Sequence, residues 1–178
     1  MANFWYGKGV QHFVNGDIAW ASNTINVALV SATYTAAQNT DEFYSVAVTS
    51  GAIVSAGVAL GTKTNVLGKV SAANTTWSSV SGSQVTQIVG YVGGTAGSGD
   101  YLLFNLNVGT NLPVTPNGGN ITAAWDPTNG IGTLRQIMDD PSVWGIIKDA
   151  FIKRWKRKDD SGIWVPAMAL YSPKLILE

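Results

Sequence analysis

The strongest constraint on the fold is a series of short alternating segments between Asn23 and Asp126. In "TINVALVSATY" every second residue from Ile25 to Leu29 is a large aliphatic, which predicts a strand with one apolar face. Further along the chain, "VTQIVGYV", "YLLFNLNV" and "NITAAW" are separated from one another by roughly 10 residues of Gly- and Asn-rich turn sequence. Because no long helical period interrupts the series, we expect a mainly β fold, an antiparallel β-sandwich or jelly-roll-like barrel.

Two segments without charged residues are also interpreted as β structure. In "VTQIVGYV" strict alternation predicts that one face of the strand carries Val85, Gln87, Val89 and Tyr91. The window from Phe43 to Leu60 has no charge, but Ser, Thr and Gly stand at turn positions within it. It is therefore interpreted as strands and turns rather than a membrane span. The first residues lack a continuous apolar stretch, so no signal peptide is expected.

A short helix is predicted near the N-terminus. Val10, Phe13 and Val14 recur at helical spacing, and Asn15-Gly16 is a natural stop. We expect this helix and the strands to form a β-sandwich domain over residues 1–132.

A second helix is predicted in residues 133–178, with Asp140 as its N-cap and Pro141 at its first position. Residues at spacings of three and four form an apolar stripe, which we expect either to pack on the sandwich or to form an interface with a partner or sister subunit: Trp144, Ile147, Phe151 and Trp155. The chain then continues as the apolar "GIWVPAMALYSPKLILE", which is typical of an extended arm or edge strand that must be buried somewhere.

The segment "KRWKRKDD", from Lys153 to Asp160, carries most of the positive charge. Residues 1–147 have four basic and seven acidic residues, net −3, and residues 148–178 have seven and four, net +3. On a helix the basic residues would cover the face opposite the apolar stripe, and the following acidic pair would repel phosphate. Nucleic-acid binding is therefore disfavoured, and the basic residues are interpreted as the solvated face of a structural helix. A more specific hypothesis is that Lys153, Arg154 and Arg157 contact an acidic surface on a partner or sister subunit.

Catalytic, metal and cofactor sites are not predicted. The chain has one histidine, His12, and no cysteine, so nucleophilic pairs have only one possible base. Gly68-Lys69 and "NGIGTL" lack the spacing of phosphate-binding loops and are interpreted as turns. The acidic residues show no calcium-loop spacing and are predicted to be scattered over turns: Asp17, Asp41, Glu42, Asp100 and Asp126.

The seven tryptophans admit two interpretations. Exposed aromatic rings can stack on sugars, whereas rings within strands more often pack in a core. Trp20, Trp77 and Trp125 stand within or beside strand-like segments, which favours packing for these three.

Several motifs together carry a resemblance over residues 4–127. "YGKGVQHFVNGDIAWASNTINVALVSATYTAAQNTDEFYSV" combines a Tyr-Gly-Lys opening, an Asn-Gly-acid turn, an Ala-Thr-Tyr-Thr segment and a Gln-Asn-Thr-Asp-Glu-Phe segment. "GVALGTKT", "TTWSSV" and "GGNITAAWD" add a glycine-rich region and two Trp-containing strands. This pattern resembles a family of small virion proteins of tailed bacteriophages, often encoded near the major capsid protein.

The resemblance implies a capsid decoration or cement protein on the virion surface that bridges major capsid protein subunits, as a homotrimer, with no catalytic residues or cofactor. Similar proteins end near Asp126, so the last 50 or so residues depart from the pattern. Three alternatives stay open. They are a tail or fibre component that binds host carbohydrate, a secreted or cell-surface β module, and an enzyme whose cleft gathers several of the acidic residues.

Overall fold

A computed structural model describes residues 3–66, 68–133, 156–158 and 164–166. The prediction of a mainly β fold with antiparallel sheets is confirmed. The helical elements are α1 (Gly7–Asn15), α2 (Tyr44–Ala47) and the 3₁₀ turn η1 (Ser50–Ala52). The strands are β1 (Phe4–Trp5), β2 (Ile25–Ser31), β3 (Ile53–Ala59), β4 (Thr64–Val66), β5 (Lys69–Ser71), β6 (Thr75–Trp77), β7 (Val85–Val92), β8 (Leu102–Leu106), β9 (Ile121–Ala123), β10 (Gly132–Thr133), β11 (Lys156–Lys158) and β12 (Trp164–Pro166).

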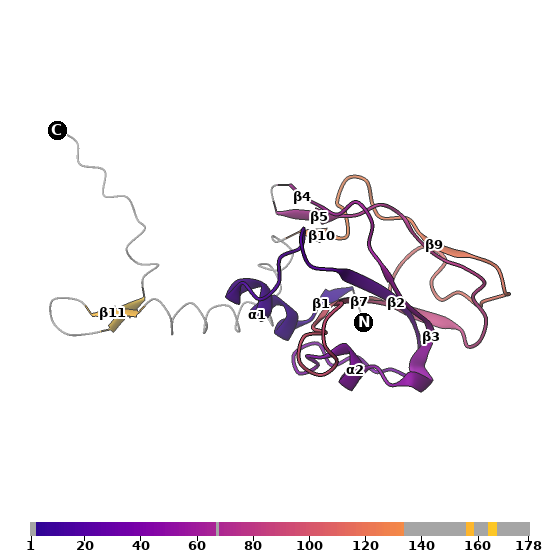
Figure 1. The fold of residues 1–178 in the computed structure, drawn as a ribbon, viewed down its shortest axis with the longest axis horizontal. Coiled ribbons are helices and arrows are strands. Elements are labelled where there is room, and N and C mark those ends of the chain that lie inside the picture. The colour runs from indigo at the N-terminus through magenta and orange to yellow at the C-terminus, as the bar shows by residue number, and fades with distance from the viewer. Residues whose placement is uncertain (1–2, 67, 134–155, 159–163, 167–178) are drawn as a thin grey trace.

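A five-stranded antiparallel sheet forms the centre of the molecule, in the order β1-β8-β7-β2-β3. Its β2 strand is apolar on both faces. Ile25, Val27 and Leu29 belong to one apolar cluster, and Ala28 and Val30 belong to a second cluster on the other side. The central sheet is therefore covered on both faces (Figure 1). The predicted face of Ile25, Val27 and Leu29 is confirmed.

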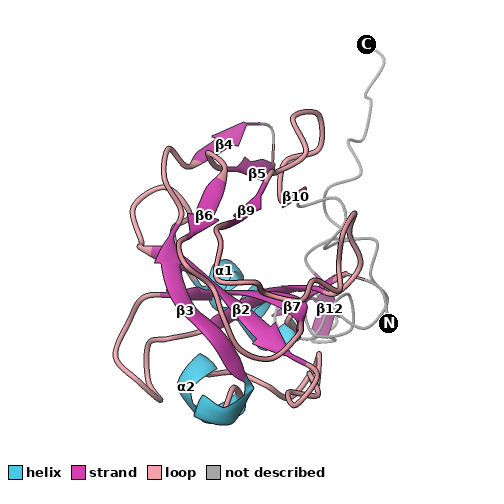
Figure 2. Cartoon of the chain, turned by 90° about the vertical axis from the view of Figure 1, so that its right-hand side faces the viewer, coloured by secondary structure: helices cyan, strands magenta, loops and turns pink. Residues whose placement is uncertain are grey.

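One face of this sheet is covered by two small antiparallel sheets, β10-β5-β4 and β6-β9. Val70 of β5 and Trp77 of β6 pack in the same cluster as Ile25. The Trp77 indole N–H also donates to the carbonyl of Val27 across the two layers, at 3.2 Å. The arrangement is sandwich-like, with a second layer made of short strands (Figure 2).

The opposite face is covered by α2 and the loops around it (Figure 2). Tyr44 of α2 stacks on Tyr91 of β7 with ring centroids 3.8 Å apart and an angle of 3° between the rings. The segment from Phe43 to Leu60 thus contains a helical turn, a 3₁₀ turn and one strand. None of the helices in the described residues is long and apolar enough to cross a membrane.

The predicted N-terminal helix is confirmed as α1. Val10 is buried in the core and Phe13 packs against it. Gly16 ends the helix in a left-handed conformation, and its N–H bonds to the last turn. Gly68 and Gly130 stand at turns, with positive φ angles of 78° and 70°. The turn interpretation is wrong for the residues that follow them, because Lys69 begins β5 and Gly132 begins β10.

The predicted face of "VTQIVGYV" is wrong at its first residue. Val30 pairs with Gln87 but Ser31 pairs with Val85, so Thr86 is an extra residue in a β-bulge. The bulge turns Val85 to the face of Ile88. Alternation in sequence holds only where the pairing has no extra residue.

The predicted C-terminal helix is wrong at its end. Residues Lys156 to Lys158 form β11, which pairs antiparallel with β12, and not the last turn of a helix. The sequence between the two strands begins Asp159-Asp160-Ser161-Gly162, and these residue types favour a turn over helix continuation. The extended conformation of Trp164–Pro166 fits the predicted arm or edge strand. The predicted boundary after residue 132 falls within β10.

Candidate functional site

A buried network joins three of the motifs that carry the family resemblance. The Tyr34 hydroxyl donates to the Asp41 carboxylate at 2.6 Å. Because that hydroxyl has only one proton, it accepts from the Tyr6 hydroxyl, which lies 2.8 Å away. Tyr6 belongs to the Tyr-Gly-Lys opening, Tyr34 to Ala-Thr-Tyr-Thr and Asp41 to the Thr-Asp-Glu-Phe segment. The network therefore ties separate loops to the edge of the sheet.

The chemistry of this network is structural. Burial raises the pKa of Tyr6 to about 12, an increase that hydrogen bonds with Tyr34 and Asn105 partly offset. Burial also raises the pKa of Tyr34, and the neighbouring Tyr6 and Asp41 raise it further. Both phenols are therefore neutral at physiological pH, and neither is activated as a nucleophile.

Two buried amides extend the network along the sheet. The Asn105 side chain donates to the Tyr6 hydroxyl at 3.2 Å and to the Gln87 side chain at 2.7 Å. Gln87 in turn donates to the carbonyl of Tyr34 at 2.7 Å. These contacts explain why a polar residue at position 87 is tolerated inside β7.

His12 lies in a separate cluster on α1. Its Nδ1 is 2.8 Å from a carboxylate oxygen of Asp17, and its Nε2 is 3.0 Å from one of Glu42. The ring also stacks on Tyr101 with centroids 3.6 Å apart. Both ring nitrogens are therefore occupied by acceptors within the chain. This geometry cross-links α1 to two loops and leaves no ring nitrogen positioned for a nucleophile.

The acidic residues predicted to be scattered over turns bond to different partners. The structure brings Asp17 and Glu42 together at His12, whereas Asp41 bonds to Tyr34. Asp100 is buried and accepts from the backbone N–H groups of Ser45 and Gly97. Within residues 3–66 and 68–133, no group of three or more His, Asp or Glu residues is arranged to hold a metal ion.

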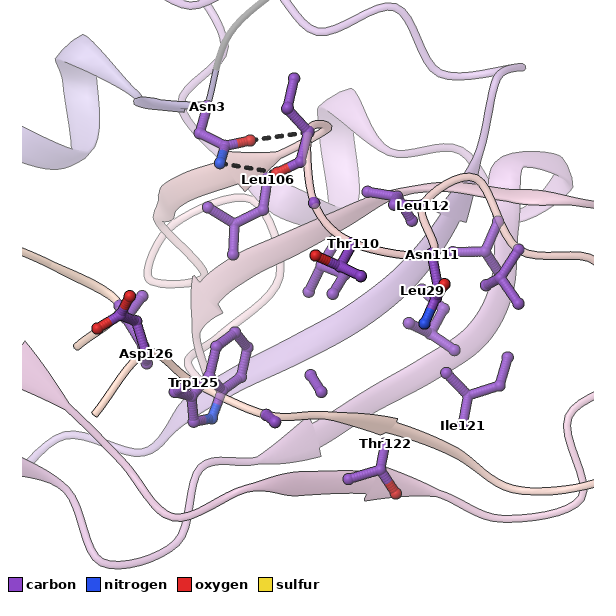
Figure 3. A pocket seen from close by; sticks show the side chains of 18 of the residues that line it. Asn3, Leu29, Leu106, Thr110, Asn111, Leu112, Ile121, Thr122, Trp125 and Asp126 are labelled. Atoms are coloured by element: carbon purple, nitrogen blue, oxygen red, sulfur yellow. Dashed lines mark hydrogen bonds between the residues drawn. The ribbon is translucent and has the colours of Figure 1, made fainter. Parts of the chain in front are cut away.

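A cavity of about 750 Å³ lies between the central sheet and β9. Leu29 and Ile88 of the central sheet contribute to its floor, and Trp125 lines one end. Its roof includes the loop from Val108 to Leu112 (Figure 3). Asn3 holds this loop, because its side chain accepts from the N–H groups of Asn107 and Val108 and donates to the Val108 carbonyl, all at 2.9 Å. We call this space the β9 cavity.

The charged side chain of the β9 cavity is Asp126. Its Oδ1 accepts the backbone N–H groups of Asn129 at 2.7 Å and of Thr128 at 2.8 Å. These two bonds lower the pKa of Asp126, so its carboxylate is ionised at neutral pH. A signal for this turn stands in the sequence as Asp126-Pro127-Thr128-Asn129-Gly130. The cavity itself is assembled from residues as far apart as Asn3 and Ile131, which no local pattern identifies.

The tryptophans follow mainly the packing interpretation. Trp20 and Trp77 are 3% and 1% exposed, which confirms it for these two, and Trp5 is also buried. Trp125 is half-buried and lines the β9 cavity, with its indole N–H donated to the carbonyl of Ala73 at 3.0 Å. Among the tryptophans whose side chains the structure describes, Trp125 is the one that lines the β9 cavity.

Of the predicted interface residues, Arg157 lies in the described residues, on strand β11. The other six lie outside them: Trp144, Ile147, Phe151, Trp155, Lys153 and Arg154. The C-terminal helix therefore stays a prediction over most of its length, with its end corrected at Lys156.

Comparison with known proteins adds no relative. No protein-family model matches the sequence, and no curated protein matches it.

Proposed function

We propose that this protein is a capsid decoration protein of a tailed bacteriophage, which cements the head by bridging major capsid protein subunits. The proposal combines the sequence resemblance over residues 4–127 with one structural observation. That observation is the small number of free charges on the described body, residues 3–66 and 68–133.

The charges of this body are few and mostly engaged. It carries three lysines and five acidic residues. Lys63 donates to the carbonyl of Asn23, and Lys69 donates to that of Thr128 at 3.1 Å. Each of the five carboxylates lies within hydrogen-bond distance of a polar group of the body itself: Asp17, Asp41, Glu42, Asp100 and Asp126. Within that body, Lys8 is the charged side chain without a hydrogen bond or ion pair.

A surface of this kind suits a protein that works by being covered. Burying a free charge in an interface costs free energy unless it finds a partner. Neutral Thr, Ser, Asn and Gly surfaces avoid most of that cost. Cementing also needs only modest contacts, because many copies bound at symmetry-related positions add their affinities.

The free edge of β3 supplies a contact surface for this role. β3 is the terminal strand of the central sheet, so among the described residues only one of its edges is paired. Its sequence, Ile-Val-Ser-Ala-Gly-Val-Ala, contains neither a charge nor a proline. Sheet edges usually carry such residues as a guard against unwanted pairing. We assign the capsid contact to this edge, through addition of a strand from the capsid protein.

The direct test uses purified protein and mature capsids that lack it. Electron microscopy after mixing should show density at discrete symmetry positions on the shell, with three copies grouped at each position. Capsids that remain undecorated at saturating protein would contradict the proposal. Particles that decorate only through scattered, unordered attachment would contradict it as well.

A further inference from the structure

The β9 cavity has the dimensions of a ligand site and lies apart from the proposed capsid contact at β3. Its volume of about 750 Å³ falls within the range of roughly 300–1,000 Å³ that small-molecule pockets occupy. The floor is apolar, with Leu29, Ile88 and Leu106 among its residues. The rim carries the hydroxyl, amide and carboxylate groups of Thr110, Asn111 and Asp126 (Figure 3).

The charge of the lining selects the class of ligand. Among the described residues that line the β9 cavity there is no lysine, arginine or histidine. Phosphorylated and carboxylated ligands are usually bound through such cations. With Asp126 as the charged group in this lining, an anion would be repelled. The site therefore favours a neutral ligand.

Trp125 provides an aromatic surface that is held in place. Its indole N–H donates to the carbonyl of Ala73, which fixes the orientation of the ring while the ring itself borders the cavity. The face of an indole carries the negative part of its quadrupole and attracts C–H groups that adjacent oxygens polarise. One face of a sugar ring presents such C–H groups.

Asp126 provides a pre-oriented acceptor next to this ring. Its Oδ1 accepts the backbone N–H groups of its own turn, which fixes the orientation of the side chain. Because Asp126 is exposed, its carboxylate can still accept hydrogen bonds from a ligand. On the roof of the cavity, the Thr110 hydroxyl and the Asn111 amide have no hydrogen-bond partner among the described residues. These groups both donate and accept, as a ligand with several hydroxyl groups requires.

We propose that the β9 cavity binds a neutral saccharide, with one sugar ring over Trp125 and sugar hydroxyls bonded to Asp126 and to the Thr110–Asn111 turn. A purely apolar occupant, including the chain's own C-terminal "LILE", would remove water from the Asp126 carboxylate without replacing its hydrogen bonds. That loss is costly for an ionised group. A saccharide replaces them.

The test uses the full chain on an array of neutral oligosaccharides of glucose, galactose, mannose, rhamnose and N-acetylglucosamine. At least one of them should bind, and calorimetry then gives its affinity. Trp125→Ala and Asp126→Asn should each weaken binding tenfold or more, whereas Trp125→Phe should weaken it less. Asp126→Asn is informative because asparagine forms the same turn. Asp17→Asn, which alters an exposed carboxylate outside the cavity, should leave the affinity unchanged.

Three results would overturn the proposal. The first is an array on which no saccharide binds, and the second is binding that neither Trp125→Ala nor Asp126→Asn weakens. The third concerns the C-terminal tail as the occupant. Since the chain has no cysteine, a Thr122→Cys, Leu175→Cys double variant that forms its disulfide in most molecules would put the tail in the cavity. Decoration of capsids by Trp125→Ala would be unaffected in every case, which separates this proposal from the capsid function.

Discussion

Gly9 of α1 packs directly on the carbonyl group of Leu102 in β8. A Cβ built on Gly9 would lie 2.1 Å from that carbonyl oxygen, far inside van der Waals contact. The helix can approach the sheet this closely only because position 9 has no side chain. The contact also explains how a helix of nine residues fits against the central sheet.

Gly9→Ala should therefore destabilise the fold by about 2–3 kcal/mol, since backbone must move to make room for the methyl group. Urea unfolding followed by fluorescence measures this loss. Gly51→Ala is the matched control, because a Cβ there meets no atom within 4 Å. A Gly9→Ala variant as stable as Gly51→Ala would contradict the packing of α1 on β8.

Tyr34→Phe removes the hydroxyl that links Tyr6 to Asp41. It leaves the Asp41 carboxylate and the Tyr6 hydroxyl without this hydrogen-bond partner, which should lower the free energy of unfolding by about 1–3 kcal/mol. Tyr101→Phe removes the same atom from a ring whose hydroxyl has no hydrogen-bond partner among the described residues, and the stack on His12 can persist. The free energy of unfolding, measured by urea titration, should fall for the first variant and stay within about 0.5 kcal/mol of the parent value for the second.

Alkaline pH should unfold the protein through its buried tyrosines. The pKa of Tyr6 rises from 10.0 to about 12 on folding. The unfolded chain then loses this proton first, so stability is full below pH 10 and falls as pH rises toward 12. The contribution of Tyr6 is about 2–3 kcal/mol at the upper end.

Urea midpoints measured from pH 9 to 11.5 test this slope. In Tyr6→Phe the free energy of unfolding should fall less steeply with pH, by roughly 1.4 kcal/mol per pH unit, because one titrating group is gone. Burial also raises the pKa of Tyr44 and Tyr91, so the variant should retain part of the slope. Identical slopes for both proteins would rule out a neutral, buried Tyr6.

Asn3→Ala should loosen the roof of the β9 cavity without unfolding the sheet. Its side chain makes three hydrogen bonds to residues 107 and 108, and their loss should cost about 1 kcal/mol. Amide hydrogen exchange of Val108 should become faster, whereas that of Val27 in β2 should not change. Equal protection of Val108 in both proteins would contradict the tether.

Ala56→Lys tests the assigned capsid contact. Ala56 is exposed on β3, and a lysine on a free edge opposes strand addition. Decoration of capsids should fall at least tenfold, while the urea midpoint should not change. Val46→Lys, at a 69% exposed position on α2, is the control and should still decorate.

A second test reverses the charges of Lys153, Arg154 and Arg157, which should weaken decoration at low salt if they face an acidic surface.

The sequence identifies β2, β7, β8 and β9 because each has its own local signal, whereas short strands such as β1, β4 and β10 were not predicted. The alternation from Ile25 to Leu29, the apolar run of β8 and the Asn15-Gly16 stop are all readable within a dozen residues. The bulge at Thr86 is not, since it depends on how β7 pairs with β2. Likewise β11 needs a partner strand, and a basic run by itself fits a helix as well as a strand.

The candidate sites were harder to predict, for a physical reason. Tyr6 and Tyr34 are 28 residues apart in sequence, and the bond between them forms only when two loops meet. The acidic residues look scattered because their partners are distant in the chain. For the β9 cavity, the signal was limited to Trp125 beside an Asp-Pro turn.

The two-sided burial of β2 has an evolutionary consequence. A strand with one wet face tolerates polar substitutions at every second position. Within β2, Ile25, Val27, Ala28, Leu29 and Val30 are each at most 1% exposed. A saturation mutagenesis scan should therefore show that substitutions are not tolerated at consecutive positions of this strand, rather than at every second one. Over evolution β2 should then vary little along its length, and most sequence variation should occur at the β3 edge and in the surface turns.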